Sequence, residues 1–410
     1  MFETFIALIG VAAILSYINK KILKLPDTIG IMILAILSAV IFSAIALVQK
    51  EIPQSFCSVI DGLDFRSFVL DFLLGFLLFA GAIHVDIKQL TKDKTPIFFY
   101  ATIGVVISTF FVGTLFYYSA HLVGLEMSYN YCLVFGALIS PTDPIAVLAL
   151  LTKAGAPKEL EIKIVGESLF NDGVGIVIFL TLLSLASMSE EGFDLAHASL
   201  DFAHEAGGGI LLGLFLGYIG HNFLTHLTEE PVISVHVSVA IVMAGYSLAT
   251  ILHVSGALAM VVAGLIVGWS MNQESTSDEQ RKHLNIFWKV IDEILNSILF
   301  LLIGIEIIAV HFHLNYFVQG LLSILFVLLA RIIVILIGNI VMPKKHRVDK
   351  NTLTILTWAG LRGGISIALA LTLEEGDIRD AILMATYVVV VFSIIGQGLT
   401  IERVVKRLSN

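Results

Sequence analysis

Residues 136–145 read Gly-Ala-Leu-Ile-Ser-Pro-Thr-Asp-Pro-Ile and lie inside an apolar stretch, Tyr129 to Leu151, that is long enough to cross a membrane as one helix. Each of the two prolines removes a backbone donor and clashes with the preceding turn, so the helix must break here. Thr142 and Asp143 are then predicted to lie between two half-helices, where freed carbonyl groups are able to bind a cation and a half-helix N-terminus favours the carboxylate. The alternative is a proline-kinked helix with Asp143 as a buried cap, which explains the prolines but not the apolar surroundings.

The whole chain has the composition of an integral membrane protein. Of its 410 residues, 57% are hydrophobic and 14% are charged, and the mean hydropathy is +0.95. Because a soluble surface needs roughly a quarter of charged residues, this composition excludes aqueous enzymes, nucleic-acid binders and disordered regulators. The net charge of −9 also provides no basic surface for nucleic acid.

Charged or turn-rich breaks divide the chain into segments of about the length that a membrane helix requires. The prediction is an all-α polytopic membrane protein of about thirteen transmembrane helices. They are Phe2 to Ile18, Thr28 to Val48, Ser67 to Val85, Pro96 to Ala120, Tyr129 to Leu151, Ile162 to Ser187, Gly207 to Leu227, Val232 to Leu252, Ser255 to Met271, Phe287 to Val310, Leu314 to Val341, Asn351 to Leu373 and Ile378 to Ile401. The stretch Pro231 to Gln273 has no charged residue, and its length suits a tight hairpin turning at His253 to Gly256.

The distribution of basic residues predicts the orientation of the chain, because cytoplasmic loops are enriched in lysine and arginine. An odd number of spans puts the termini on opposite sides. One side has only Lys50, Arg66 and Arg379, whereas the other has nineteen basic residues: Lys20, Lys21, Lys24, Lys88, Lys92, Lys94, Lys153, Lys158, Lys163, Arg281, Lys282, Lys289, Lys344, Lys345, Arg347, Lys350, Arg403, Lys406 and Arg407. The N-terminus is therefore expected outside the cell membrane and the C-terminus in the cytoplasm.

A second interruption is predicted in the twelfth span. Residues 360–364 read Gly-Leu-Arg-Gly-Gly, and three glycines weaken a helix by about 1 kcal/mol each. If spans one to six and eight to thirteen are repeats, the fifth span corresponds to the twelfth, as expected for inverted repeats with two broken, crossing helices. Arg362 would then lie near the crossing, where its charge neutralises half-helix C-termini and nearby acids. Close helix packing would explain the glycines but not the arginine.

The sixth span has a polar patch in an otherwise apolar helix. Helical spacing aligns Glu167 with Asn171 and Ser168 with Asp172. Beside Thr142 and Asp143, this patch provides several of the oxygen ligands that a hard cation prefers. Two carboxylates in an apolar site need a partner, and Arg331, isolated in the apolar eleventh span, is the natural partner for one of them. The sequence alone does not choose which.

In this order, these motifs resemble those of the cation:proton antiporter superfamily, specifically the NhaP-like sodium/proton antiporters of its first branch (CPA1). The matching residues are Ser140-Pro-Thr-Asp-Pro144, Gly166-Glu-Ser-Leu-Phe-Asn-Asp-Gly173, Arg331 and Gly360-Leu-Arg-Gly-Gly364. The resemblance covers essentially the whole chain, and the combination is highly specific although each motif alone is weak.

The resemblance implies a role for each matching residue. Asp172 would alternately bind a proton and Na⁺, helped by Ser168 and the Thr142 main chain, while Asn171 and Asp143 would hold the broken helix. Glu167 and Arg331 would form a structural ion pair. The fold implied is a homodimer in which a core of spans 4–6 and 11–13, about residues 96–187 and 314–401, moves against a dimerisation domain. That domain would be spans 1–3 and 8–10, about residues 2–86 and 232–310, with span 7, about residues 207–227, as the linker.

The sequence departs from the family in the third span. Many relatives have an acid within a Phe-Glu-Gly-like stretch, where this chain has Phe79-Ala80-Gly81. If the alignment holds, one cation ligand is missing at Ala80. Glu306 is either a further intramembrane acid or an interfacial residue near His311.

The function expected from these features is Na⁺ or Li⁺ exchange for protons across the inner membrane by alternating access, with no cofactor beyond the transported ions. Competition at Asp172 implies one proton per cation and no net current, because Asn171 is neutral and Glu167 is offset by Arg331. The alternatives are a K⁺/H⁺ antiporter of the same fold and, in a different class, an intramembrane aspartyl protease that uses Asp143 and Asp172. The protease is disfavoured because neither aspartate lies in the Gly-Xaa-Gly-Asp motif of such enzymes.

Overall fold

The computed structural model describes residues 2–48, 73–187, 195–227, 230–307 and 312–408. Within them the chain is helical and contains no strand. The α-helices are α1 (Phe2–Ile18), α2 (Asp27–Val48), α5 (Leu74–Ile83), α6 (Ile87–Lys92), α7 (Lys94–Ala101), α8 (Ile103–Leu122), α9 (Tyr129–Ile139), α10 (Ile145–Ala154), α11 (Lys158–Ser187), α12 (Leu195–Asn222), α13 (Pro231–Ile251), α14 (Gly256–Met271), α15 (Asp278–Glu306), α16 (Leu314–Val341), α17 (Lys350–Trp358), α18 (Gly364–Ala370), α19 (Asp377–Val391) and α20 (Gly398–Leu408).

Each of the thirteen predicted segments contains helix within the described residues, which confirms the all-α fold class. Seven helical stretches are long and apolar enough to cross a membrane, and α2, α5, α9 and α14 are shorter apolar helices. The remaining segments fall short for local reasons. The tenth span begins inside α15, whose first half carries charge, the twelfth is divided into α17 and α18, and the first part of the third span lies outside the described residues.

The boundaries of the helices follow from local capping groups. Ser277 and Gln280 form a reciprocal capping box that starts α15, and the side chain of Ser128 accepts a hydrogen bond from the backbone of Tyr131 at the start of α9. The predicted hairpin is confirmed, since α13 ends at Ile251 and α14 begins at Gly256. His253 turns the chain there with a φ of 53°.

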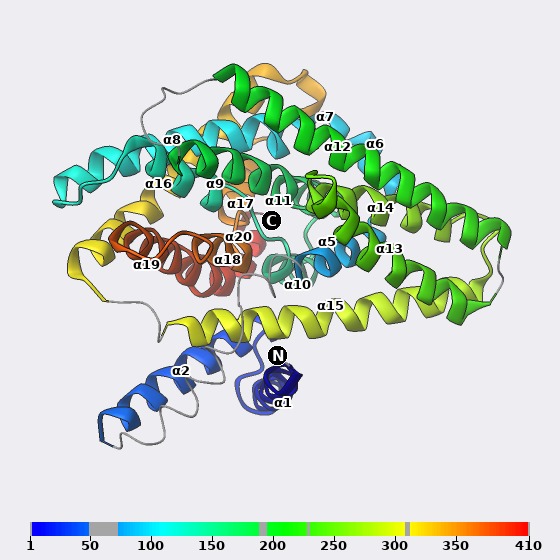
Figure 1. Cartoon of the computed structure of the whole chain (residues 1–410), viewed down its shortest axis with the longest axis horizontal. Coiled ribbons are helices and arrows are strands. Elements are labelled where there is room, and N and C mark those ends of the chain that lie inside the picture. Colours follow the sequence, from blue (N-terminus) through cyan, green and yellow to red (C-terminus); the bar gives the residue numbers. More distant parts are fainter. Residues whose placement is uncertain (1, 49–72, 188–194, 228–229, 308–311, 409–410) are drawn as a thin grey trace.

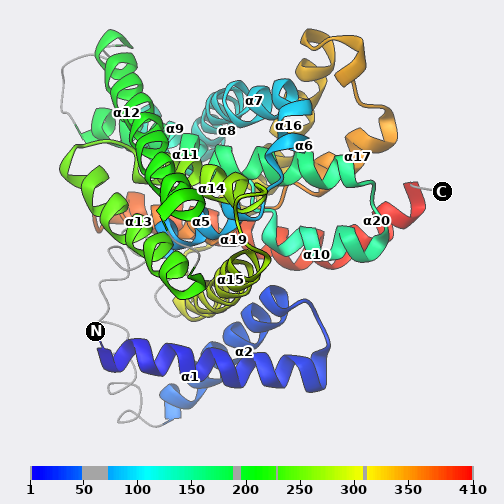
Figure 2. The same ribbon diagram turned by 90° about the vertical axis from the view of Figure 1, so that its right-hand side faces the viewer.

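Helix α15 lies between two groups of helices (Figure 1). It packs on α1 and α2 on one side and on α5, α13 and α18 on the other. Turned by 90°, the view shows α1 and α2 below α15 and the other helices above it (Figure 2). Glycines allow the closest packing of α14 on α5, because a Cβ at Gly264 would lie 2.8 Å from the carbonyl oxygen of Phe79.

A second set of contacts joins the elements that contain the sequence motifs. Helix α11 packs on α7 and α9, and α16 packs on α8, α17 and α19. Helix α18 packs on α9, and α10 packs on α20. The two interrupted spans therefore lie next to each other, and the halves of each break are held by different neighbours.

Three short π-helical segments that lie wholly within the described residues were not predicted: Asn19–Leu23, Phe223–Leu227 and Phe392–Gln397. A wider turn of this kind occurs mostly as a local insertion in a longer helix. The first two extend α1 and α12, and the third joins α19 to α20 within the predicted last span.

Candidate functional site: a carboxylate at a broken-helix crossing

The two predicted helix breaks meet in the structure. Helix α9 ends at Ile139 and α10 begins at Ile145, while α17 ends at Trp358 and α18 begins at Gly364. The backbone N–H of Asp143 donates to the carbonyl oxygen of Leu361 over 2.8 Å. Because each extended segment satisfies a backbone group of the other, the crossing supplies part of the hydrogen bonding that both helices lose at their breaks.

Asn171 joins the first break to α11. Its side-chain nitrogen donates to Thr142 Oγ1 over 2.9 Å, and its side-chain oxygen accepts from the Thr142 backbone N–H over 3.3 Å. The hydroxyl oxygens of Thr142 and Ser168 lie 3.0 Å apart. All three side chains are buried, so this network fixes the position of the non-helical segment against the helix that carries Asp172.

Asp172 lies one helical turn beyond Ser168 and is 9% exposed. It lines a cavity of about 780 Å³, and so do Thr142 and Asp143 from the break in span five. The structure thus brings Asp172, Thr142 and Asp143 to the wall of one cavity, with Ser168 bonded to Thr142 beside them. These oxygen atoms are suited to a small hard cation.

The structure answers the question of which carboxylate Arg331 contacts. Both terminal nitrogens of Arg331 bond to Glu167, with Arg331 Nη1 contacting Oε1 and Nη2 lying 3.0 Å from Oε2. Arg331 Nε also donates to the carbonyl oxygen of Leu356 over 3.2 Å. This bidentate pair connects α11 to α16, and the third bond connects α16 to α17 just before the second break.

Arg362 lies in the second break and is 1% exposed. Its Nη1 lies 3.5 Å from the carbonyl oxygen of Gly360, and its Nε has no hydrogen-bond partner among the described residues. The charge is therefore placed beside the C-terminal end of α17, as the sequence predicts. Within the described part of the chain no ion pair joins Arg362 to a carboxylate, and neutralisation of the nearby acids by its charge stays a prediction.

The cavity runs from the crossing to an acidic mouth. The mouth is lined by the exposed Asp86, Lys289 and Glu293 and by the half-buried Glu161. These residues adjoin the lysine-rich loops that the charge distribution assigns to the cytoplasm. The lining residues between mouth and crossing are mostly apolar, among them Leu77, Leu148, Ile162, Val165, Leu169 and Leu299.

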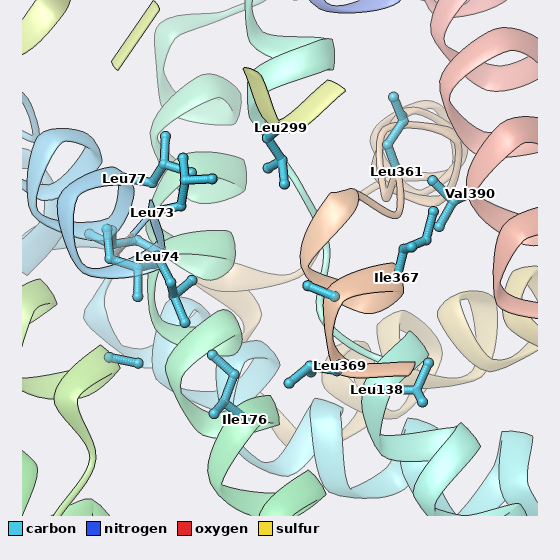
Figure 3. Close-up of a cluster of buried hydrophobic side chains, with 14 of the residues drawn as sticks. Leu73, Leu74, Leu77, Leu138, Ile176, Leu299, Leu361, Ile367, Leu369 and Val390 are labelled. Carbon is cyan, nitrogen blue, oxygen red and sulfur yellow. The ribbon is translucent and has the colours of Figure 1, made fainter. Parts of the chain in front are cut away.

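An apolar layer of buried side chains lies beyond Asp172, on the side away from the mouth. Ile176 lies one turn beyond Asp172 on the same face of α11, and it is buried, as are Leu138 and Leu369 of the same hydrophobic cluster. None of the three lines the cavity. Figure 3 shows Leu138, Ile176 and Leu369 at one end of the hydrophobic cluster, and Leu77 and Leu299, which line the cavity, nearer the other.

Sequence reasoning missed one acid of this cavity. Asp292 and Glu293 lie near the start of the predicted tenth span, where solvation is the default expectation, yet Asp292 is half-buried and lines the cavity that contains Asp172. A signal was present, because Asp292, Asn296 and Leu299 are spaced for a single face of α15. The structure also places Ala80 in the cavity wall, at the position where the family resemblance suggests an acid.

Two other residues considered from the sequence, Glu306 and His311, are not placed relative to the site. Helix α15 ends at Glu306, whose side chain is not among the described ones, and His311 also lies outside the described residues. His221 bonds to Ser270 Oγ over 2.9 Å, away from the crossing. No group of three or more metal-binding side chains occurs in the described ranges.

Gly363 provides a test of the crossing. A Cβ at this position would overlap the side chain of Asp143. We expect Gly363→Ala to displace Asp143 and to lower the maximal exchange rate in proteoliposomes by about tenfold or more, since forcing atoms into a packed site costs about 1–3 kcal/mol. Gly207→Ala is the matched control, because a Cβ there meets nothing within 4 Å. Equal rates in the two variants would show that the crossing tolerates the extra atom.

Comparison with known proteins gives a consistent result along the whole chain. The family model described as the transmembrane region of sodium/hydrogen exchangers matches residues 9–407. The Na⁺/H⁺ antiporter NhaP of Pseudomonas aeruginosa is 41% identical over 413 aligned positions, which cover 100% of this chain and 97% of that protein. The Na⁺/H⁺ antiporter NhaH of Halobacillus aidingensis is 31% identical and covers 95% of this chain and 93% of its own length.

A solved structure has the same fold. The sodium proton antiporter MjNhaP1 from Methanocaldococcus jannaschii at pH 8 superimposes with a TM-score of 0.77. The match covers 98% of this chain and 97% of that one at 21% sequence identity. At this identity the likeness concerns the fold, and it agrees with the arrangement of interrupted helices seen here.

Proposed function

The chain belongs to the sodium/hydrogen exchanger family and is a Na⁺/H⁺ antiporter, and we propose that Asp172 is the carboxylate at which the two ions compete. The observation that carries this proposal is the place of Asp172 in the cavity wall, with the Thr142 and Ser168 oxygens beside it. Na⁺ would bind to Asp172, Ser168 and Thr142, while a proton would bind to Asp172 alone. Both ions are substrates, and the mechanism needs no resident cofactor.

Competition at one carboxylate explains why the two movements are coupled. A bare carboxylate is too costly to carry across an apolar layer, whereas a carboxylate neutralised by a proton or by Na⁺ is not. The layer of Leu138, Ile176 and Leu369 would act as the barrier that enforces this rule. Only the occupied site would change sides, so each crossing carries one ion or the other.

The change of sides is proposed to be a movement of the core against the rest. The cavity lies between α5 and α15 on one wall and the α9–α10 break, α10, α11 and α18 on the other. These walls belong to the two proposed domains, about residues 2–86 and 232–310 against about 96–187 and 314–401. A cavity between two separately packed units is where rocking of one unit exposes the site first to one side and then to the other.

The surroundings of the chain complete the proposal. The protein would lie in the inner membrane with the N-terminus outside and the C-terminus in the cytoplasm, in line with its basic loops. It would form a homodimer through the domain that contains α1 and α2. The described structure then has its cavity open to the cytoplasm.

The proposal is tested with purified protein in liposomes, with Na⁺, Li⁺ and K⁺ offered separately while internal pH is monitored. Exchange with Na⁺ and Li⁺ but not K⁺ is expected. Exchange with K⁺ alone would favour the K⁺/H⁺ antiporter instead. The intramembrane protease is not favoured, because the chain belongs to a transporter family.

Exchange is expected to carry no net charge. Asn171 is neutral, and Glu167 is balanced by its contact with Arg331, so Asp172 alone changes its charge state. A potential of 100 mV contributes about 2.3 kcal/mol for each net charge moved, so one extra proton per cycle would shift the equilibrium roughly fifty-fold. The measurement clamps liposomes with potassium and valinomycin, after K⁺ is shown not to be transported, and finds the Na⁺ gradient at which exchange stops. Movement of that null point with potential would contradict one-to-one exchange and direct attention to Asp143 or Asp292.

A further inference from the structure

One face of α15 follows the cavity from its mouth inward. Lys289, Asp292 and Leu299 all line the cavity, and their spacing of three and seven residues is that of a single helical face. Asn296 lies on the same face, between Asp292 and Leu299. The acid therefore lies in the cavity wall between the mouth and the crossing, and the amide, which does not itself line the cavity, is buried beside it.

The orientation of the Asn296 side chain is set by its donors. Its nitrogen donates to the backbone carbonyl of Asp292 over 2.9 Å and to Asp292 Oδ1 over 3.0 Å. Asn296 is 3% exposed, and its Oδ1 has no hydrogen-bond partner within the described residues. A buried acceptor left without a donor is unfavourable, so this atom is expected to serve a ligand.

We propose that Asp292 and Asn296 form a second cation-binding site, which takes partly hydrated Na⁺ or Li⁺ from the mouth before the ion reaches Asp172. A carboxylate and a carbonyl oxygen are ligands that hard cations prefer, and water from the cavity would complete the coordination. The site deepens the proposed function, because it feeds the exchange at Asp172 and carries no ion across by itself.

The position of this site predicts that it affects Na⁺ binding from one side of the membrane only. Helix α15 packs on α1, α2, α5 and α13, which belong to the part proposed to stay in place, and it meets the proposed core at α18, across the cavity. Asp292 therefore does not travel with Asp172. It contributes to cation binding while the cavity is open to the cytoplasm, and it is out of reach for ions that arrive from the other side.

The test compares Asp292→Asn with Glu293→Gln in everted and right-side-out vesicles. Glu293 is the matched control, because it is an exposed acid at the mouth without an amide partner. For Asp292→Asn we expect the Na⁺ KM on the cytoplasmic side to rise about five- to tenfold, with the KM on the other side changed less than twofold. Glu293→Gln is expected to leave both values within twofold. Asn296→Leu keeps the charge and removes the oxygen, and it should also raise the cytoplasmic KM.

Three outcomes would overturn the inference. The second site is rejected if Asp292→Asn elutes and melts like the parent protein and its cytoplasmic KM is unchanged. If the cytoplasmic KM rises equally in Asp292→Asn and Glu293→Gln, and both rises disappear in high choline chloride, the two acids act only through long-range electrostatic attraction and not as a binding site. Loss of maximal rate from both sides would make Asp292 a transported carboxylate.

The role of Asp172 is tested separately from the second site. Exchange that persists in Asp172→Asn rejects the proposed function, whereas a side-specific KM shift in Asp292→Asn concerns the second site alone. If Asp292→Asn does not fold, the Asn296→Leu variant decides, and an unchanged cytoplasmic KM there overturns the inference.

Discussion

Asp172→Asn is expected to reduce Na⁺-dependent proton movement to the leak rate of protein-free liposomes. The amide has nearly the same shape as the carboxylic acid, so the helix and its contact with the Thr142 segment should persist. It cannot take up and release a proton, and it carries no charge to attract Na⁺. The measurement is the change of internal pH after a Na⁺ pulse, together with the elution profile and melting temperature of the variant.

Asp278→Asn is the control for this experiment. It removes one carboxylate from a side chain that is 99% exposed at the start of α15, and it should exchange like the parent protein. Coupled exchange near the parent rate in Asp172→Asn would place the carrier carboxylate elsewhere. Complete loss in both variants would point to a general effect of charge rather than to this site.

The second large effect concerns the stability that depends on Glu167 and Arg331. Removing either partner, as in Glu167→Gln or Arg331→Gln, leaves an uncompensated buried charge and should lower the free energy of unfolding by about 3–5 kcal/mol. The double variant should lose less than the sum of the single losses, because neither charge is then left alone. The free energies are measured by unfolding the protein in mixed detergent micelles.

An exposed pair provides the comparison for this cycle. Lys406 and Glu402 contact each other over 2.6 Å on the last helix, where solvent screens the charges. The same cycle on this pair should yield a coupling of about 0.5 kcal/mol or less. Additive losses at Glu167 and Arg331 would mean that the buried contact contributes no more than the exposed one.

The sequence predicted the helices well, because length and hydropathy decide which segments are helical in a membrane. Pro141 and Pro144 located the first break, since a missing donor acts locally and needs no partner to be recognised. The charge-free stretch Pro231 to Gln273 located the hairpin for the same kind of reason. The interruption at Thr102, between α7 and α8, had no such signal and was not predicted.

The sequence did not predict the contacts between distant segments. Arg331 and Glu167 are 164 residues apart, and their meeting depends on how α16 is rotated against α11. Asp292 was misjudged for a related reason. Asp292 lies close to the predicted end of a span, which suggested that its side chain is solvated. The helix instead begins earlier, at Asp278, and the face of α15 that carries Asp292 is turned toward the cavity.

In the proposed cycle, the apolar layer of Leu138, Ile176 and Leu369 would also determine where the membrane voltage acts. A wide cavity open to bulk electrolyte is nearly equipotential with that bulk, so little of the field falls between its mouth and Asp172. The field is concentrated instead across the thin layer of low dielectric constant beyond Asp172. Cation association from the cytoplasm should therefore be almost independent of voltage, and the transit of an empty, charged carboxylate would feel most of the potential. The layer makes futile return of the empty site steeply dependent on voltage, even in a cycle whose productive steps move no net charge.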